Sequence, residues 1–135
     1  MNVDVLDEAV TFIEDHPEKH NQAVWTCSTG ACLAGHITLL NGYQVATEDC
    51  GEFMGGEYVL NGVVLDPRTN LRREVSATAQ NLLDATSDET NLLFAAGNTA
   101  EDLRLMAKDV ANDEDITKLW KLIDVDTEIP KAVRA

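Results

Sequence analysis

The sequence predicts an α+β fold that is mainly helical, and three observations support this prediction. Apolar residues recur at helical spacing over most of the chain, which is typical of helices that surround one core. One β-rich stretch, residues 57–66, is centred on Asn61-Gly62, a dipeptide typical of a tight hairpin turn. The 135 residues fit a single domain. We therefore expect about five helices around one core, with a small β-hairpin inserted between the second and third helices.

The first two helices are predicted from their apolar pattern and from the residues that end them. The first is amphipathic and has acidic residues in its first turn, which stabilise the positive end of the helix dipole. It ends before Pro17, because the residue that precedes a proline is pushed out of the helical region. The second helix is expected over residues 31–40, capped by Ser28 or Thr29 and ended by Asn41-Gly42.

The rest of the chain is predicted by the same criteria. An apolar stripe begins again at residue 71, and capping residues separate the later helices. The remaining expected elements are a strand over residues 43–46, a helix over residues 71–83, a helix from Ser87 to Gly97, a helix opened by the pair Thr99 and Asp102, and a last helix capped by Asp113.

The chain is expected to form one globular domain over residues 1–124, followed by a flexible tail over residues 125–135. Its apolar runs are only a few residues long, whereas a membrane-spanning helix needs about 20 residues. The first residues lack the basic and apolar regions of a signal peptide. Three cysteines, an odd number, suit a reducing compartment. We therefore expect a cytoplasmic location.

The charge of the chain is strongly negative. The formal net charge is −14, and Lys19 is the only lysine or arginine before Arg68. Such a field repels nucleic acid and anionic membranes, so we expect neither as a direct partner. It favours solubility, which is the simpler interpretation, or a basic partner protein. Asp7 and Glu8 are the adjacent acidic residues that we would expect to contact such a partner.

Trp120 is a further candidate for partner binding. It lies on the last predicted helix, beside other apolar residues. If that helix does not fold back, its indole ring is an aromatic anchor of the kind enriched at interfaces. Packing in the core is the favoured alternative.

Residues 25–36 combine a tryptophan, two cysteines and an Ala-Gly pair in the order Trp-Thr-Cys-Ser-Thr-Gly-Ala-Cys-Leu-Ala-Gly-His. This order resembles the Trp-x-Cys-x-Thr-x-x-Cys-x-Ala-Gly motif of a group of small proteins from bacteria and their phages, notably actinobacterial phages. A second block, with Leu93-Phe94-Ala95 and Asn98-Thr99, resembles the same group. His36 stands where the group generally has tryptophan. The group has no established activity, so the resemblance implies an origin and a helical fold but no reaction.

Cys27, Cys32 and His36 are candidate metal ligands, with Cys50 as a fourth. Zinc binds thiolate and imidazole, and Cys32 and His36 share one face of the expected helix. Structural zinc sites usually present a second close pair of ligands, however, and this chain has none. We therefore favour buried cysteines that act as small apolar residues, and expect no cofactor.

Three functional hypotheses follow from these observations. The favoured one is a non-enzymatic phage or prophage accessory protein that binds a host or phage protein, because no complete catalytic constellation is found in the sequence. The second is an acidic mimic of DNA that inhibits a DNA-binding protein. The third is a small metal- or thiol-dependent enzyme that uses Cys27, Cys32 and His36.

Overall fold

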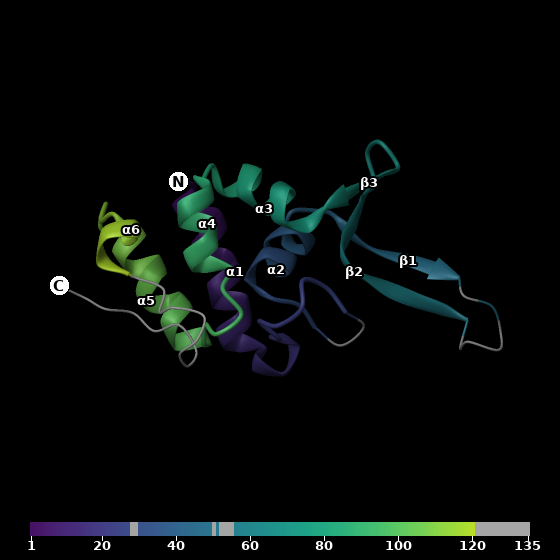
Figure 1. Cartoon of the computed structure of the whole chain (residues 1–135), viewed down its shortest axis with the longest axis horizontal. Coiled ribbons are helices and arrows are strands. Elements are labelled where there is room, and N and C mark those ends of the chain that lie inside the picture. The colour runs from purple at the N-terminus through teal and green to yellow at the C-terminus, as the bar shows by residue number, and fades with distance from the viewer. Residues whose placement is uncertain (28–29, 50, 52–55, 121–135) are drawn as a thin grey trace.

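The computed structural model describes residues 1–27, 30–49, 51 and 56–120. Within this part of the chain there are six α-helices, five of them with seven residues or more, and one three-stranded antiparallel sheet. The helices pack together at one end of an elongated molecule, and the sheet extends from the other end (Figure 1). The prediction of a mainly helical α+β fold is confirmed.

Helix α1 (Val3–Asp15) has the predicted amphipathic form. Its inward face is made of Leu6, Ala9, Val10 and Ile13, all of them buried. The Asn2 side chain caps the helix by accepting a hydrogen bond from the Val5 N–H at 3.2 Å. A short 3₁₀ helix, η1 (Pro17–Lys19), follows at the predicted stop.

Helix α2 (Leu33–Leu40) begins two residues later than predicted, and Cys32 occupies its N-cap position. Ala31 is not helical because its backbone is used elsewhere: its N–H donates to the Lys19 carbonyl at 3.0 Å, and its carbonyl accepts from the Asn21 N–H at 3.0 Å. The predicted caps at 28 and 29 lie outside the described residues. The helix ends at Asn41 and Gly42, as predicted.

The sheet has three strands in the order β1 (Gln44–Asp49), β2 (Glu57–Asp66) and β3 (Leu71–Glu74). The strand expected over residues 43–46 is therefore present as β1. Residues 71–74, expected to be helical, instead pair with the end of β2. Leu71 belonged to the predicted apolar stripe, but its side chain is 53% exposed.

The predicted hairpin turn at Asn61-Gly62 is wrong, because both residues lie inside β2. Val45 pairs with Val64 and Thr47 pairs with Val59, so β2 bulges between Val59 and Val64. Gly62 has φ +86°, the left-handed conformation that makes Asn-Gly a turn signal. The bulge uses this conformational freedom without reversing the chain.

Four helices complete the described part: α3 (Val75–Leu83), α4 (Ser87–Leu93), α5 (Ala100–Ala111) and α6 (Ile116–Leu119). The predicted capping box of Thr99 and Asp102 is confirmed at the start of α5. Helix α6 is capped by Asp115 and not by Asp113, since the Asp115 carboxylate accepts from the Thr117 N–H at 2.9 Å. No helix of the described residues is long and apolar enough to span a bilayer.

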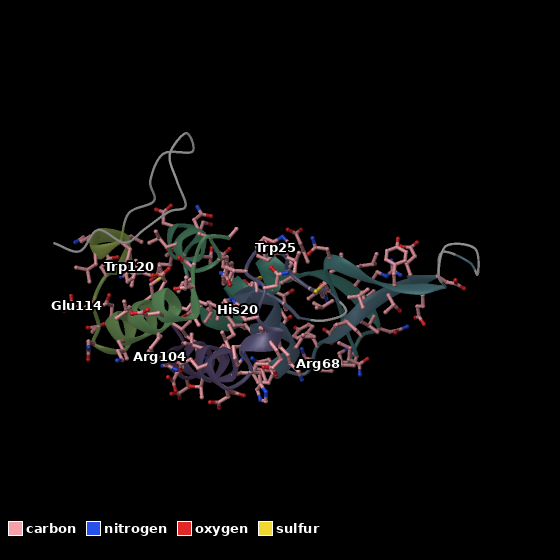
Figure 2. All side chains as sticks on the ribbon, turned by 90° about the horizontal axis from the view of Figure 1, so that it is seen from below. His20, Trp25, Arg68, Arg104, Glu114 and Trp120 are labelled. Carbon is pink, nitrogen blue, oxygen red and sulfur yellow. The ribbon has the colours of Figure 1, made fainter. Side chains whose placement is uncertain are left out.

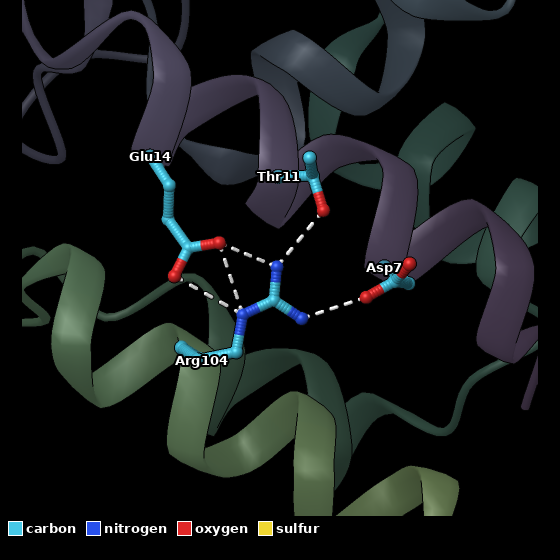
Figure 3. Close-up of polar contacts among 4 residues, drawn as sticks. All are labelled: Asp7, Thr11, Glu14 and Arg104. Carbon is cyan, nitrogen blue, oxygen red and sulfur yellow. Dashed lines mark hydrogen bonds and ion pairs between the residues drawn. The ribbon is translucent and has the colours of Figure 1, made fainter.

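Helices α1 and α5 are joined at the surface by the guanidinium group of Arg104 (Figure 3). It donates to the Asp7 carboxylate at 2.6 Å, to the Glu14 carboxylate at 2.6 Å and to the Thr11 hydroxyl at 2.9 Å. Hydrogen bonds to Glu14, followed by those to Asp7, raise the pKa of Arg104, so its charge is fixed. Below this contact, side chains from α1 to α6 share one apolar core. The tail predicted over residues 125–135 lies outside the described residues.

Candidate functional site

Two blocks of the sequence, residues 25–36 and 93–99, meet in the structure at Trp25 and Phe94. Their rings are in edge-to-face contact, with centroids 6.1 Å apart and planes at 86°. Trp25 precedes α2, whereas Phe94 is the C-cap of α4, so a contact across 69 positions joins the blocks. Figure 2 shows Trp25 where the helices meet the sheet.

The Trp25 loop, residues 20–26, is held between α2 and β2. The Asn61 side chain accepts hydrogen bonds from the backbone N–H groups of Trp25, at 2.8 Å, and of Thr26, at 3.3 Å. The Thr26 hydroxyl donates to the Leu60 carbonyl at 2.7 Å. On the other side Gly35 touches the loop so closely that a Cβ there would lie 2.0 Å from the Trp25 carbonyl oxygen. The loop backbone is therefore fixed from two directions.

Two buried amides hold the other half of the contact. The Gln22 side chain donates to the Leu93 carbonyl at 3.1 Å and accepts from the Leu33 N–H at 3.2 Å. Asn98 donates to the carbonyls of Leu92, at 2.6 Å, and Leu93, at 3.2 Å. These bonds satisfy carbonyl groups at the end of α4 that have no hydrogen-bond donor within the helix. They explain why polar residues are tolerated in the core.

Two cavities lie beside the aromatic pair and share both rings. The larger, about 280 Å³, lies over α3 and α4 and the smaller, about 120 Å³, lies over the Trp25 loop. Besides Trp25 and Phe94, the larger is lined by Ser76, Gln80, Ser87, Thr90, Asn91 and Ala95, and the smaller by Gln22, Ala23, Val24, Cys32 and Ala96. We call the two cavities together the Trp25–Phe94 site.

The described side chains that line the Trp25–Phe94 site are all uncharged, although the net charge of the chain is −14. Polar groups in the larger cavity remain available to a ligand. Within the described residues, neither the Trp25 indole N–H nor the Asn91 side-chain amide has a protein hydrogen-bond partner. Gln80 donates to the Ala85 carbonyl at 3.2 Å, which leaves its amide oxygen as an acceptor. The site therefore offers donors, acceptors and two aromatic rings without a formal charge.

A larger cavity of about 460 Å³ has the opposite character. It lies between the first turns of α4 and α6 and contains five carboxylates, of Asp88, Glu89, Asp113, Glu114 and Asp115. Two of these cap helices: Glu89 accepts from the Thr86 N–H at 2.9 Å, and Asp115 caps α6. In the part of the chain that the structure describes, no three possible ligands are grouped so that they could hold a metal ion. Helix capping accounts for two of the five carboxylates, and the cluster by itself does not indicate a ligand.

The candidate metal ligands are placed as follows. Cys32 is 2% exposed in the core, and burial raises the pKa of its thiol. His36 is 5% exposed, its Nε2–H donates to the Lys19 carbonyl at 2.8 Å, and burial lowers its pKa. Cys27 is half-buried and its N–H donates to the Gly30 carbonyl. Cys50 lies outside the described residues. Cys32 thus behaves as a small apolar residue, the interpretation that the sequence favoured.

The candidate partner-binding residues differ from one another in exposure. Trp120 is 3% exposed and its indole N–H donates to the Asp109 carboxylate at 2.9 Å, so it is a core residue and not a surface anchor. Figure 2 places it at the end of the molecule away from the sheet. Asp7 and Glu8 are both exposed on α1, but Asp7 is bound to Arg104.

Sequence reasoning pointed to Trp25 but treated it as a core anchor, and it missed the two cavities. The signal that was present is the position of both rings inside the two sequence blocks, residues 25–36 and 93–99. Asn98, a polar residue within the second block, and Gln22, three residues before the first, were a second signal. Comparisons of this chain with protein-family models, with curated proteins and with solved structures gave no match.

Proposed function

We propose that this chain acts by binding another protein, and that it receives an uncharged segment of that protein at the Trp25–Phe94 site. The observation that supports this proposal is the pair of uncharged cavities that share two aromatic rings on a molecule of net charge −14. Concave sites with aromatic walls and a few directed polar groups are the usual form of a binding site.

The chemistry of the lining indicates what the segment contains. In the smaller cavity the methyl groups of Ala23, Val24 and Ala96 suit an aliphatic side chain. In the larger cavity the Trp25 N–H and the Asn91 amide suit a neutral hydrogen-bonding group, such as a backbone amide or a hydroxyl. A charged side chain would lose its hydration there and find no opposite charge, so it would bind poorly.

The site is also held in place before a partner arrives. The backbone of the Trp25 loop is fixed by Asn61 and by Gly35, and the end of α4 is fixed by Gln22 and Asn98. Binding to a preformed site loses less conformational entropy than binding to a mobile one. The acidic surface around the site would then act mainly on the rate at which a basic partner associates.

The other two hypotheses receive less support from the geometry. A DNA mimic needs carboxylates that are free to replace phosphates, but on α1 Arg104 binds both Asp7 and Glu14. A thiol enzyme built on Cys32 needs an accessible thiolate, but burial keeps that thiol protonated. That the partner is a host or phage protein stays a prediction, and it rests on the resemblance alone.

Photo-crosslinking tests the proposal directly. A benzophenone amino acid is placed at Asn91, an exposed position that lines the larger cavity, and in a control at Glu8 on α1. Irradiation in a lysate of the cells that make the protein is expected to give a discrete crosslinked partner from position 91 and none from position 8. Equal products from both positions, or none from position 91, would contradict the proposal.

A matched pair of variants then measures the contribution of the site. Asn91→Arg places bulk and charge at the larger cavity, whereas Asn81→Arg makes the same change at an exposed position of α3 that lines neither cavity. With the partner identified by crosslinking, Asn91→Arg is expected to raise the Kd about tenfold or more, a loss of roughly 1.4 kcal/mol. Asn81→Arg is expected to leave the Kd unchanged. Equal Kd values for the two variants would exclude the site.

A further inference from the structure

Strand β1 is an edge strand that extends beyond the helices. The order of the sheet is β1-β2-β3, and within the described residues β1 pairs only with β2. Strand β3 pairs with residues 63–66 of β2, so the earlier residues of β2 are paired on the β1 side only. We call β1 together with residues 57–60 the sheet arm. Figure 1 shows it leading away from the helical body.

The arm and its base expose apolar side chains. Among the described residues, the large apolar side chains with high exposure are Val45 at 39%, Tyr58 at 48% and Leu71 at 53%, and all three belong to the sheet. Elsewhere on the described surface no large apolar side chain reaches this exposure. Exposed apolar groups that gather on one element mark a surface for interaction.

The arm is acidic on both of its faces. Residues that pair directly across an antiparallel sheet point to the same face. Glu48 pairs with Tyr58, so these two share one face, and Asp49 pairs with Glu57 on the other face. All four side chains are exposed. A segment that adds beside β1 would therefore meet carboxylates above and below the sheet.

The edge of β1 has few of the features that prevent strand addition. Edge strands are usually protected by lysine, by proline or by a covering element. The sequence of β1, Gln-Val-Ala-Thr-Glu-Asp, has neither lysine nor proline. Its acidic residues oppose a second copy of this chain, whose net charge is also −14, but they attract a basic segment.

We propose that the outer edge of β1 receives an extended, basic segment of a partner protein as a fourth strand of the sheet. The main-chain hydrogen bonds of the added strand supply affinity, and its lysine or arginine side chains contact Glu48 on one face and Asp49 and Glu57 on the other. The Tyr58 ring offers a cation–π contact on the Glu48 face. This inference rests on the proposed function, that the chain binds a protein, but it uses a surface other than the Trp25–Phe94 site.

Peptide binding tests this inference with a defined probe. The probe is a fluorescent, capped peptide that repeats Lys-Lys-Val-Val, so that lysines lie on both faces of the strand. It is long enough to pair with Gln44–Asp49, and its binding to the full chain is followed by anisotropy. A second peptide of the same sequence carries N-methyl groups at alternate residues, and a third carries them at the residues between. N-methylation removes strand hydrogen bonds and keeps the charge. We expect one of these two peptides to bind roughly tenfold more weakly than the parent, the effect of losing one or two hydrogen bonds.

Charge reversal locates the contact. The double variant Glu48→Lys and Asp49→Lys changes the arm, and the double variant Glu8→Lys and Asp15→Lys makes the same change of net charge on α1. We expect the arm variant to weaken binding of the lysine–valine peptide about tenfold more than the α1 variant. Equal weakening by both variants, or equal affinity for all three peptides, would show charge attraction without strand addition and would overturn the inference.

The result is separable from the test of the Trp25–Phe94 site. Asn91→Arg is expected to leave the affinity for the lysine–valine peptide within about twofold, because Asn91 lies on α4 and not on the sheet. Failure of the peptide to bind would therefore overturn strand addition alone. Failure of crosslinking from position 91 would overturn the Trp25–Phe94 site alone.

Discussion

The Trp25 loop and the sheet arm are both non-helical parts of one chain, but they are stabilised in opposite ways. The backbone of the loop packs directly against Gly35 of α2, and its Trp25 ring packs on Phe94. The Trp25 N–H also donates a hydrogen bond to the Asn61 side chain. The arm exposes Tyr58 and acidic side chains, and among the described residues no strand pairs with the outer edge of β1. The comparison shows that contacts from several elements fix the backbone of a preformed site. A strand edge that receives another strand is held by fewer tertiary contacts. Substitutions should therefore change stability in the loop and binding in the arm.

The largest effect is expected for Gly35→Ala. The new Cβ would lie 2.0 Å from the Trp25 carbonyl oxygen and 2.6 Å from the Ala31 Cβ, so backbone must move to admit it. We expect a loss of about 3 kcal/mol or more in the free energy of unfolding, measured by denaturant titration. Gly42→Ala is the control, because at φ +95° it has no close neighbour and its strain costs about 1–2 kcal/mol. Similar losses for the two variants would mean that the loop is not packed against α2 as described.

Removal of the Arg104 guanidinium is expected to have the next largest effect. Arg104→Ala leaves Asp7 and Glu14 of α1 without their partner, at a contact where the Arg104 side chain is largely buried. We expect a loss of about 1–2 kcal/mol in the free energy of unfolding, and a smaller loss at high salt, because salt screens exposed charges. Arg104→Lys is expected to recover only part of it, since an ammonium group cannot reproduce the fork of hydrogen bonds. An unfolding curve equal to that of the wild type would show that this contact does not join α1 to α5.

Asn61→Ala tests the connection between the sheet and the Trp25 loop. The change removes the side-chain oxygen that accepts hydrogen bonds from the Trp25 and Thr26 N–H groups. Because Asn61 is exposed, water can replace part of this hydrogen bonding. We expect a loss of about 1 kcal/mol in the free energy of unfolding and faster hydrogen exchange at the Trp25 and Thr26 amides. Unchanged exchange at these two amides would contradict the role assigned to Asn61.

Acid is expected to destabilise the fold through His36. Burial lowers its folded-state pKa below the ordinary value near 6.5, so the unfolded chain takes up a proton more readily. The stability that neutral His36 provides is therefore complete above about pH 6.5 and is lost as the pH falls below it. His36→Gln keeps an N–H donor for the Lys19 carbonyl and removes this loss, whereas His16→Gln, at a half-buried ring near the end of α1, is the control. Equal pH profiles for wild type and His36→Gln would contradict this assignment.

The smallest effect on stability is expected in the arm. Tyr58→Ala removes a side chain that is 48% exposed, and we expect the free energy of unfolding to change by about 0.5 kcal/mol or less. The same variant is expected to bind the lysine–valine peptide more weakly, because the cation–π contact is lost. A large loss of stability with unchanged peptide binding would contradict the claim that substitutions in the arm change binding more than stability.

Local patterns predicted the helices better than the sheet. Helix α1 and the capping box of α5 depend on neighbours in sequence, and both were predicted correctly. The Asn61-Gly62 signal reports a backbone that accepts positive φ, and it does not distinguish a turn from a bulge. The contact of Asn61 with Trp25 and Thr26, 36 and 35 positions away, accompanies the bulge, and no local pattern contains it.

The sequence predicted only part of the candidate site. Trp25 was singled out by its motif, but the cavities exist because Phe94 and α3 lie beside it, which depends on the packing of distant helices. Trp120 was open to two interpretations because the return of α6 to the core is a tertiary property. Asp7 and Glu8 look equivalent in sequence, and only the position of Arg104 separates them.

The most direct test of the central claim is the indole region of the ¹H–¹⁵N NMR spectrum during titration with the partner identified by crosslinking. The chain has two tryptophans, Trp25 beside the cavities and Trp120 in the core, so each reports on a different region. We predict that the Trp25 indole signal shifts on binding while the Trp120 signal does not, and that Asn91→Arg abolishes the shift where Asn81→Arg preserves it. A complex that forms while the Trp25 signal stays unchanged would contradict the claim that the Trp25–Phe94 site receives the partner.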